Sequence, residues 1–251
     1  METQHTQSHN FDINVFVEAT SKLSLDKSYD DVFFQETNQG FITGVIDAAV
    51  NVQLDDYEKI NRQAIKDFVS LAETLPLKRA ASQWAHIHHN RLAFYKHRNP
   101  LLAVSAVEIN LNKNTLEFYR AADCEVWVLT NNEWVNLFPE HMWTTKGLKV
   151  AKIGQKKNPT LEQWWSYQEK ELDDLDLWRY PTLGLSPHPV FGIKRMALDN
   201  VQEIVLSTDG ALLNEEKLRT LDPWLGQEIH KEREGRECNH GDIALTKIVM
   251  P

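Results

Sequence analysis

Aspartates stand at the ends of strand-like segments throughout this sequence. Each one follows or flanks a short apolar run of the kind that forms a buried strand. They are Asp30, Asp31, Asp47, Asp123, Asp209 and Asp242. The end of a buried strand lies near apolar protein, where a carboxylate is costly unless it is hydrogen-bonded, paired or bound to a metal. A lone aspartate in such a place is more often a turn or cap residue, so the prediction of a site depends on the whole set.

Several strand ends that converge on one edge would bring these carboxylates together and concentrate negative charge. A divalent cation offsets such repulsion. Oxygen ligands without His or Cys favour Mg²⁺ or Mn²⁺ over Zn²⁺. The set therefore predicts a site for a hard divalent cation.

Composition limits the remaining possibilities. The chain has 251 residues, of which 42% are hydrophobic, and this suits one domain with a substantial core. Its formal net charge of -9 disfavours broad nucleic-acid binding, which needs Lys and Arg on phosphates. Cys124 and Cys238 have no zinc spacing and are too few for a disulfide framework, so a cytoplasmic setting is the simpler expectation. We expect no membrane segment, because no apolar run approaches about 20 residues.

Hydrophobic periodicity predicts the elements that would position the aspartates. Strands are expected at 13–18, 32–34, 41–46, 102–109, 115–120, 125–130, 134–138, 191–197, 203–207 and 243–249, and helices at 54–72, 77–95, 161–177 and 215–220. Tight turns between consecutive strands favour antiparallel sheets. We predict a loose tail over 1–10 and one α+β domain over 11–251, with a peripheral excursion at about 140–180.

The aspartate-bearing segments also share an order with a known family. Tyr29-Asp30-Asp31 is similar to an Asn-Glu-Asp motif, and the strand ending at Asp47 resembles one that leads into Asp-Gly. The run 117–129 is similar to a strand pair around Gly-Asp-Ser, 182–184 to Ala-Leu-Gly, 203–210 to a strand ending in Ser-Asp-Gly, and 241–246 to a closing Asp-Asn-Ile-Thr strand. In this order the chain resembles the metal-dependent protein phosphatases of the type-2C class, as a divergent, bacterial-like member.

The resemblance implies a fold, a reaction and a set of roles. The fold would be two packed antiparallel β-sheets flanked by helix pairs. Two Mg²⁺ or Mn²⁺ ions, or one, would activate a water that attacks the phosphorus of a phosphoserine or phosphothreonine protein. By position, Asp31, Asp47 and Asp209 would carry catalysis and hold metal, with Asp47 shared between the ions. The Ala48 carbonyl would be a further metal ligand, and Asp123 would support a weaker ion.

Three departures from the family pattern affect this prediction. Ala48 stands where the family has Gly, and a backbone needing positive φ would not tolerate it easily. The family's phosphate-binding Arg has no match, because Asp26 occupies about its position; Lys27 beside it could supply charge but lacks the bidentate fork. Asp242 lies one residue beyond its expected metal-ligand position, on the other face of a strand unless a bulge intervenes.

These departures leave three hypotheses open. The first is a metal-dependent phosphoprotein phosphatase. The second is a pseudophosphatase, in which the same fold serves as a binding or regulatory module. The third is a hydrolase of a small phosphorylated compound. The sequence leaves the oligomeric state open.

Overall fold

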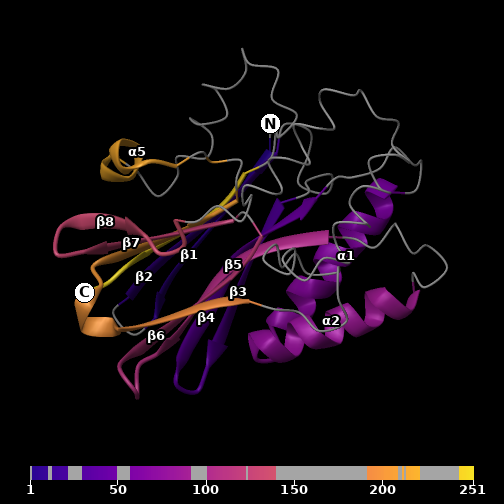
Figure 1. Cartoon of the computed structure of the whole chain (residues 1–251), viewed down its shortest axis with the longest axis horizontal. Coiled ribbons are helices and arrows are strands. Elements are labelled where there is room, and N and C mark those ends of the chain that lie inside the picture. The colour runs from indigo at the N-terminus through magenta and orange to yellow at the C-terminus, as the bar shows by residue number, and fades with distance from the viewer. Residues whose placement is uncertain are drawn as a thin grey trace, which may run out of the picture.

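The structure is a computed structural model, and it describes residues 2–10, 13–21, 30–49, 57–91, 101–122, 124–139, 191–208, 211, 213–220 and 243–251. Two β-sheets pack face to face, and two long helices cover the outer side of one of them (Figure 1). The α+β class with two packed antiparallel sheets, predicted from the sequence, is confirmed.

Both sheets are antiparallel at every strand pairing described. The five-stranded sheet runs in the order β3 (Asp30–Thr37), β4 (Gly40–Ala49), β5 (Leu101–Asn110), β6 (Thr115–Ala121) and β9 (Gly192–Ala197). The six-stranded sheet runs in the order β1 (Glu2–Asn10), β2 (Ile13–Ser21), β11 (Ile243–Val249), β10 (Glu203–Ser207), β7 (Glu125–Thr130) and β8 (Glu133–Asn136).

Side-chain alternation along the strands builds separate apolar layers. On β4, Phe41 and Val45 belong to the core between the two sheets, whereas Ile42 and Ile46 face the helices. This is the period of two expected of strands buried on both faces. It also decides which way every polar residue on the same strands points.

The helices are held on the five-stranded sheet by a shared aromatic layer. α1 (Tyr57–Ala72) and α2 (Leu77–Arg91) contribute Phe68 and Trp84, both fully buried. The Trp84 indole Nε1 donates to the carbonyl of Ala64 at 2.8 Å, which gives its buried polar atom a partner. None of the described helices is long and apolar enough to cross a membrane.

One terminal prediction is corrected by the structure. Residues 1–10, expected as a loose tail, instead include β1, in which every residue from Glu2 to Asn10 lies opposite a residue of β2. The prediction of a loose tail was based on the absence of an apolar run in this segment. A strand at a sheet edge pairs with its neighbour through backbone hydrogen bonds, so its side chains can be polar. The expected helix at 161–177 and the excursion at 140–180 lie outside the described residues.

The outer face of the six-stranded sheet carries a smaller apolar cluster under a short helix. α5 (Glu215–Arg219) begins after Asn214, whose side chain accepts from the backbone N–H of Lys217. Leu218 packs with Trp134, Val205 and Leu245 in this cluster. A 3₁₀ turn, η3 (Leu198–Asn200), joins β9 to the segment before β10.

The close packing around Gly44 on β4 leaves no room for a side chain. A Cβ added there would lie 2.5 Å from Phe33 Cζ and 2.6 Å from the carbonyl oxygen of Ser105, which is backbone and cannot turn away. We expect Gly44→Ala to lower the free energy of unfolding by about 2–3 kcal/mol in urea denaturation.

Gly192→Ala is the matched control, because its Cβ would first meet a side-chain atom, Phe138 Cε1, at 3.2 Å. We expect that variant to lose less than about 1 kcal/mol. Equal losses in the two variants would contradict the close approach of β4 to its neighbours.

Candidate active site

Four strand ends meet at one end of the sandwich. β3 begins at Asp30, which lies directly across from Asp47 near the end of β4. β10 ends at Ser207, and the backbone N–H of the following Thr208 donates to the carbonyl of Ala244 at the start of β11. The start of β3, the end of β4, the end of β10 and the start of β11 therefore lie at the same end of the sandwich, although they are far apart in the sequence.

Register places Asp30 and Asp47 on the same face of the sheet, the face toward the other sheet. Asp47 continues the alternation of Phe41 and Val45, which lie in the core between the sheets. On β3, Val32 and Phe34 pack against that core and share their face with Asp30. Residues directly opposite in an antiparallel pair have Cβ atoms about 4.5–5.5 Å apart, and two like charges there repel each other.

A hydrogen bond ties this pair to the opposite sheet. The Thr208 hydroxyl donates to Asp30 Oδ2 at 2.6 Å and accepts from the backbone N–H of Ala244 at 3.1 Å. Thr208 is fully buried and Asp30 is nearly so. The carboxylate of Asp30 is thus fixed relative to β10 and β11, and Asp209 follows Thr208 directly.

Asp31 points to the other side of β3. It lies across from Ile46, which packs under the helices, and its Oδ1 accepts from the backbone N–H of Val32 at 2.8 Å. Burial raises the pKa of Asp31, and the Val32 hydrogen bond opposes that shift. Smaller opposing effects come from Glu73, which raises the pKa, and Lys66, which lowers it; both belong to the α1 region.

The backbone at position 48 has a conformation that alanine adopts without strain. It is buried, lies within β4 and pairs with Leu102 of β5. Among the described residues, Ala48 does not have positive φ. An extended backbone accepts Ala as readily as Gly, so the expected conflict does not arise at this position.

The other predicted site residues lie outside the part of the chain that the structure describes: Lys27, Asp123, Asp209 and Asp242. Three of them adjoin described residues in the sequence. Thr208 precedes Asp209, Ile243 follows Asp242, and Ala122 and Cys124, both buried, flank Asp123. Within the described ranges, no group of three or more His, Cys, Asp or Glu could hold a metal.

Sequence reasoning counted Asp30 among the strand-end aspartates but gave the metal-binding role to Asp31, and it gave Thr208 no role. Counting alternation outward from the apolar Val32 and Phe34 would have placed Asp30 on the face of Asp47. No comparable signal marks Thr208, because its partners come from β3 and β11, which are remote in sequence.

Comparison of this architecture with solved structures finds close agreement over nearly the whole chain. The S. agalactiae serine/threonine phosphatase matches with a TM-score of 0.61 at 11% identity, over 99% of this chain and 100% of that one. The chain has the fold of the type-2C phosphatases.

Two further structures with this phosphatase fold agree. Serine/threonine phosphatase Stp1 from Staphylococcus aureus matches with a TM-score of 0.59 at 10% identity, over 99% of this chain and 94% of its own. RsbX, crystallised in complex with magnesium, matches with a TM-score of 0.59 at 11% identity, over 99% and 100%. Neither a protein-family model nor a curated protein matches the sequence.

We expect the two hydrogen bonds of the Thr208 hydroxyl to contribute to the stability of the protein. Thr208→Val removes the donor to Asp30 and the acceptor for Ala244 N–H, and both groups stay buried. We expect a loss of about 1–3 kcal/mol in the free energy of unfolding. Thr208→Ser, which keeps the hydroxyl, should recover most of it.

Thr246→Val on β11 is the matched control. Thr246 is also fully buried, but none of the residues that the structure describes hydrogen-bonds to its Oγ1. Replacing an unsatisfied hydroxyl by a methyl group is close to neutral or stabilising. If Thr246→Val cost as much as Thr208→Val, the bond between the sheets would not be the cause.

Proposed function

We propose that this protein hydrolyses phosphate monoesters with the help of bound Mg²⁺ or Mn²⁺. One observation carries the proposal. Asp30 and Asp47 lie opposite each other on the inner face, where Thr208, immediately before Asp209, reaches across from the other sheet. This is a collection of hard oxygen donors at a sandwich end, in a fold shared with known phosphatases.

The donor chemistry fits a hard divalent cation. Carboxylate and hydroxyl oxygens suit Mg²⁺ and Mn²⁺, and two adjacent carboxylates supply the negative charge that such an ion offsets. We propose Asp30, Asp47 and Asp209 as the principal ligands. When bound, the ions would supply an activated water and neutralise charge on the phosphoryl group.

In this proposal Asp30, and not Asp31, is the metal ligand contributed by β3. The Thr208 hydrogen bond orients the Asp30 carboxylate before any ligand arrives, and such preorganisation lowers the cost of assembling a site. Asp31 would act only through the placement of β3. The Ala48 carbonyl, Asp123 and Asp242 as metal ligands, and Lys27 at the phosphate, stay predictions.

The structural neighbours support a proposal for the substrate class. The solved structures with this fold include serine/threonine phosphatases. We therefore propose phosphoserine or phosphothreonine proteins as substrates, in the cytoplasm, with no role for nucleic acid.

A pseudophosphatase is the second candidate, and specific residues favour it. Asp26 occupies about the place of the family's phosphate-binding Arg, and Lys27 beside it lacks the bidentate fork. Asp242 lies one residue beyond the position expected of a metal ligand. The fold and the Asp30–Thr208 contact would then serve a binding or regulatory module. A hydrolase of a small phosphorylated compound is the third candidate.

Hydrolysis of p-nitrophenyl phosphate with Mn²⁺ tests the proposal. We expect metal-dependent turnover that Asp47→Asn and Asp209→Asn each reduce by at least about 100-fold, because each removes a charged ligand. Asp199→Asn is the matched control: Asp199 is exposed in η3, accepts from Asn114 and should leave turnover unchanged.

Each outcome selects one hypothesis. Turnover of both the aryl phosphate and phosphopeptides supports the phosphatase. Turnover of the aryl phosphate without any phosphopeptide cleavage supports the small-compound hydrolase. Absence of turnover together with absence of Mn²⁺ binding in calorimetry contradicts the enzyme and leaves the pseudophosphatase.

A further inference from the structure

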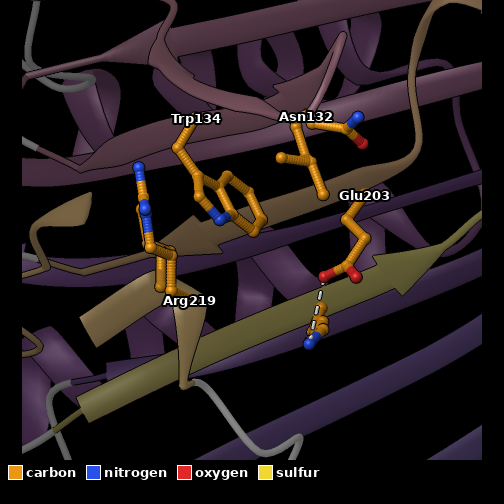
Figure 2. Close-up of a pocket in the computed structure, with 7 residues that line it drawn as sticks. Asn132, Trp134, Glu203 and Arg219 are labelled. Atoms are coloured by element: carbon orange, nitrogen blue, oxygen red, sulfur yellow. Dashed lines mark ion pairs between the residues drawn. The ribbon is translucent and has the colours of Figure 1, made fainter. Parts of the chain in front are cut away.

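A hollow lies on the outer face of the six-stranded sheet, the face away from Asp30 and Asp47. It has a volume of about 270 Å³ and is bordered by α5, the β7–β8 hairpin and the middle of the sheet. Figure 2 shows side chains from these elements around it. The volume is just below the usual range for drug-sized ligands, so the hollow suits a small molecule.

Strand geometry separates this hollow from the candidate active site. Glu203 begins β10 beside the hollow, and Ser207 ends β10 four residues later, near Thr208. At about 3.3 Å per residue the two lie roughly 13 Å apart along the strand. The hollow and the candidate active site also lie on opposite faces of the sheet. Glu203 shares the outer face with Val205, whereas Leu206 faces the core between the sheets and Thr208 donates to Asp30 on that side.

Cations outnumber carboxylates in the lining. Lys247 Nζ lies 3.1 Å from Glu203 Oε2, and the Lys247 side chain is only 11% exposed. Arg219, on the last turn of α5, adds a second cation, and within the described part of the chain no ion pair includes it. The lining therefore has an excess of one positive charge, in a protein whose net charge is -9.

Trp134, Leu218 and Leu129 form an apolar wall of the hollow. Trp134 is only 8% exposed and packs against Leu218 and Leu129. Asn132 at the hairpin turn is fixed by its side-chain contact with Gln202, which donates to Asn132 Oδ1 at 3.1 Å. An aromatic wall beside an Arg is a common arrangement for recognising flat anions, since both groups can contact one ligand without rearrangement.

We propose that this hollow binds a small organic anion, with an apolar ring against Trp134 and Leu218 and its charged group at Arg219. The Lys247–Glu203 pair would fix the floor and add positive potential. This inference goes beyond the proposed phosphatase activity and does not depend on it, because none of the residues involved belongs to the aspartate cluster.

Calorimetric titration in EDTA tests the proposal without any contribution from metal. The probe is 2-naphthoate, compared with the neutral 2-naphthamide and with inorganic phosphate, which lacks an apolar part. We expect 2-naphthoate to bind with a Kd of about 1 mM or below. The other two compounds should bind at least about tenfold more weakly. 2-Naphthamide lacks the negative charge, and inorganic phosphate lacks the apolar ring.

Variants identify the location of binding. Arg219→Gln, at an exposed position, should weaken 2-naphthoate at least about fivefold, and Trp134→Phe should weaken it while keeping an apolar wall. Arg79→Gln, an exposed arginine on α2, is the matched control for loss of one surface charge and should change nothing.

Three results would overturn the proposal. They are no saturable binding of 2-naphthoate, equal binding of 2-naphthamide, or equal loss of affinity in Arg219→Gln and Arg79→Gln. Phosphatase activity is measured separately with Mn²⁺, so failure of one proposal is distinguishable from failure of the other.

Discussion

The hydrogen bond from Thr208 to Asp30 joins the two sheets at the end where the candidate active site lies. It fixes a carboxylate from the five-stranded sheet against the residue that precedes Asp209 in the six-stranded sheet. Thr208 is itself held by the start of β11 through Ala244. This contact fixes the ends of β3, β10 and β11 relative to one another.

The same contact explains how the fold tolerates an unfavourable arrangement. Asp30 and Asp47 are directly opposite, and Asp30 is nearly buried, so repulsion and desolvation act on the same pair. A hydrogen bond to a carboxylate stabilises its charged form and offsets part of that cost. The divalent cation proposed above would offset more of this cost.

The sequence predicted the fold well and the site only in part. Alternation identified β5, β6, β7, β10 and β11 nearly to the residue, because these strands are buried and their apolar periodicity is strong. It missed β1, whose polar residues are paired through the backbone. Motif position favoured Asp31, whereas register turns Asp30 toward Asp47; a shift of one residue reverses the face, and only the pairing of β3 with β4 reveals it. The outer hollow left no sequence signal, since its lining comes from four separate elements.

Manganese affinity of two neighbouring variants, measured by calorimetry, tests this account most directly. Asp30→Asn and Asp31→Asn remove the same charge one residue apart, from opposite faces of β3. The account predicts that Asp30→Asn weakens Mn²⁺ binding at least about tenfold, while Asp31→Asn leaves it within about twofold. Loss of binding in Asp31→Asn with unchanged binding in Asp30→Asn would contradict it.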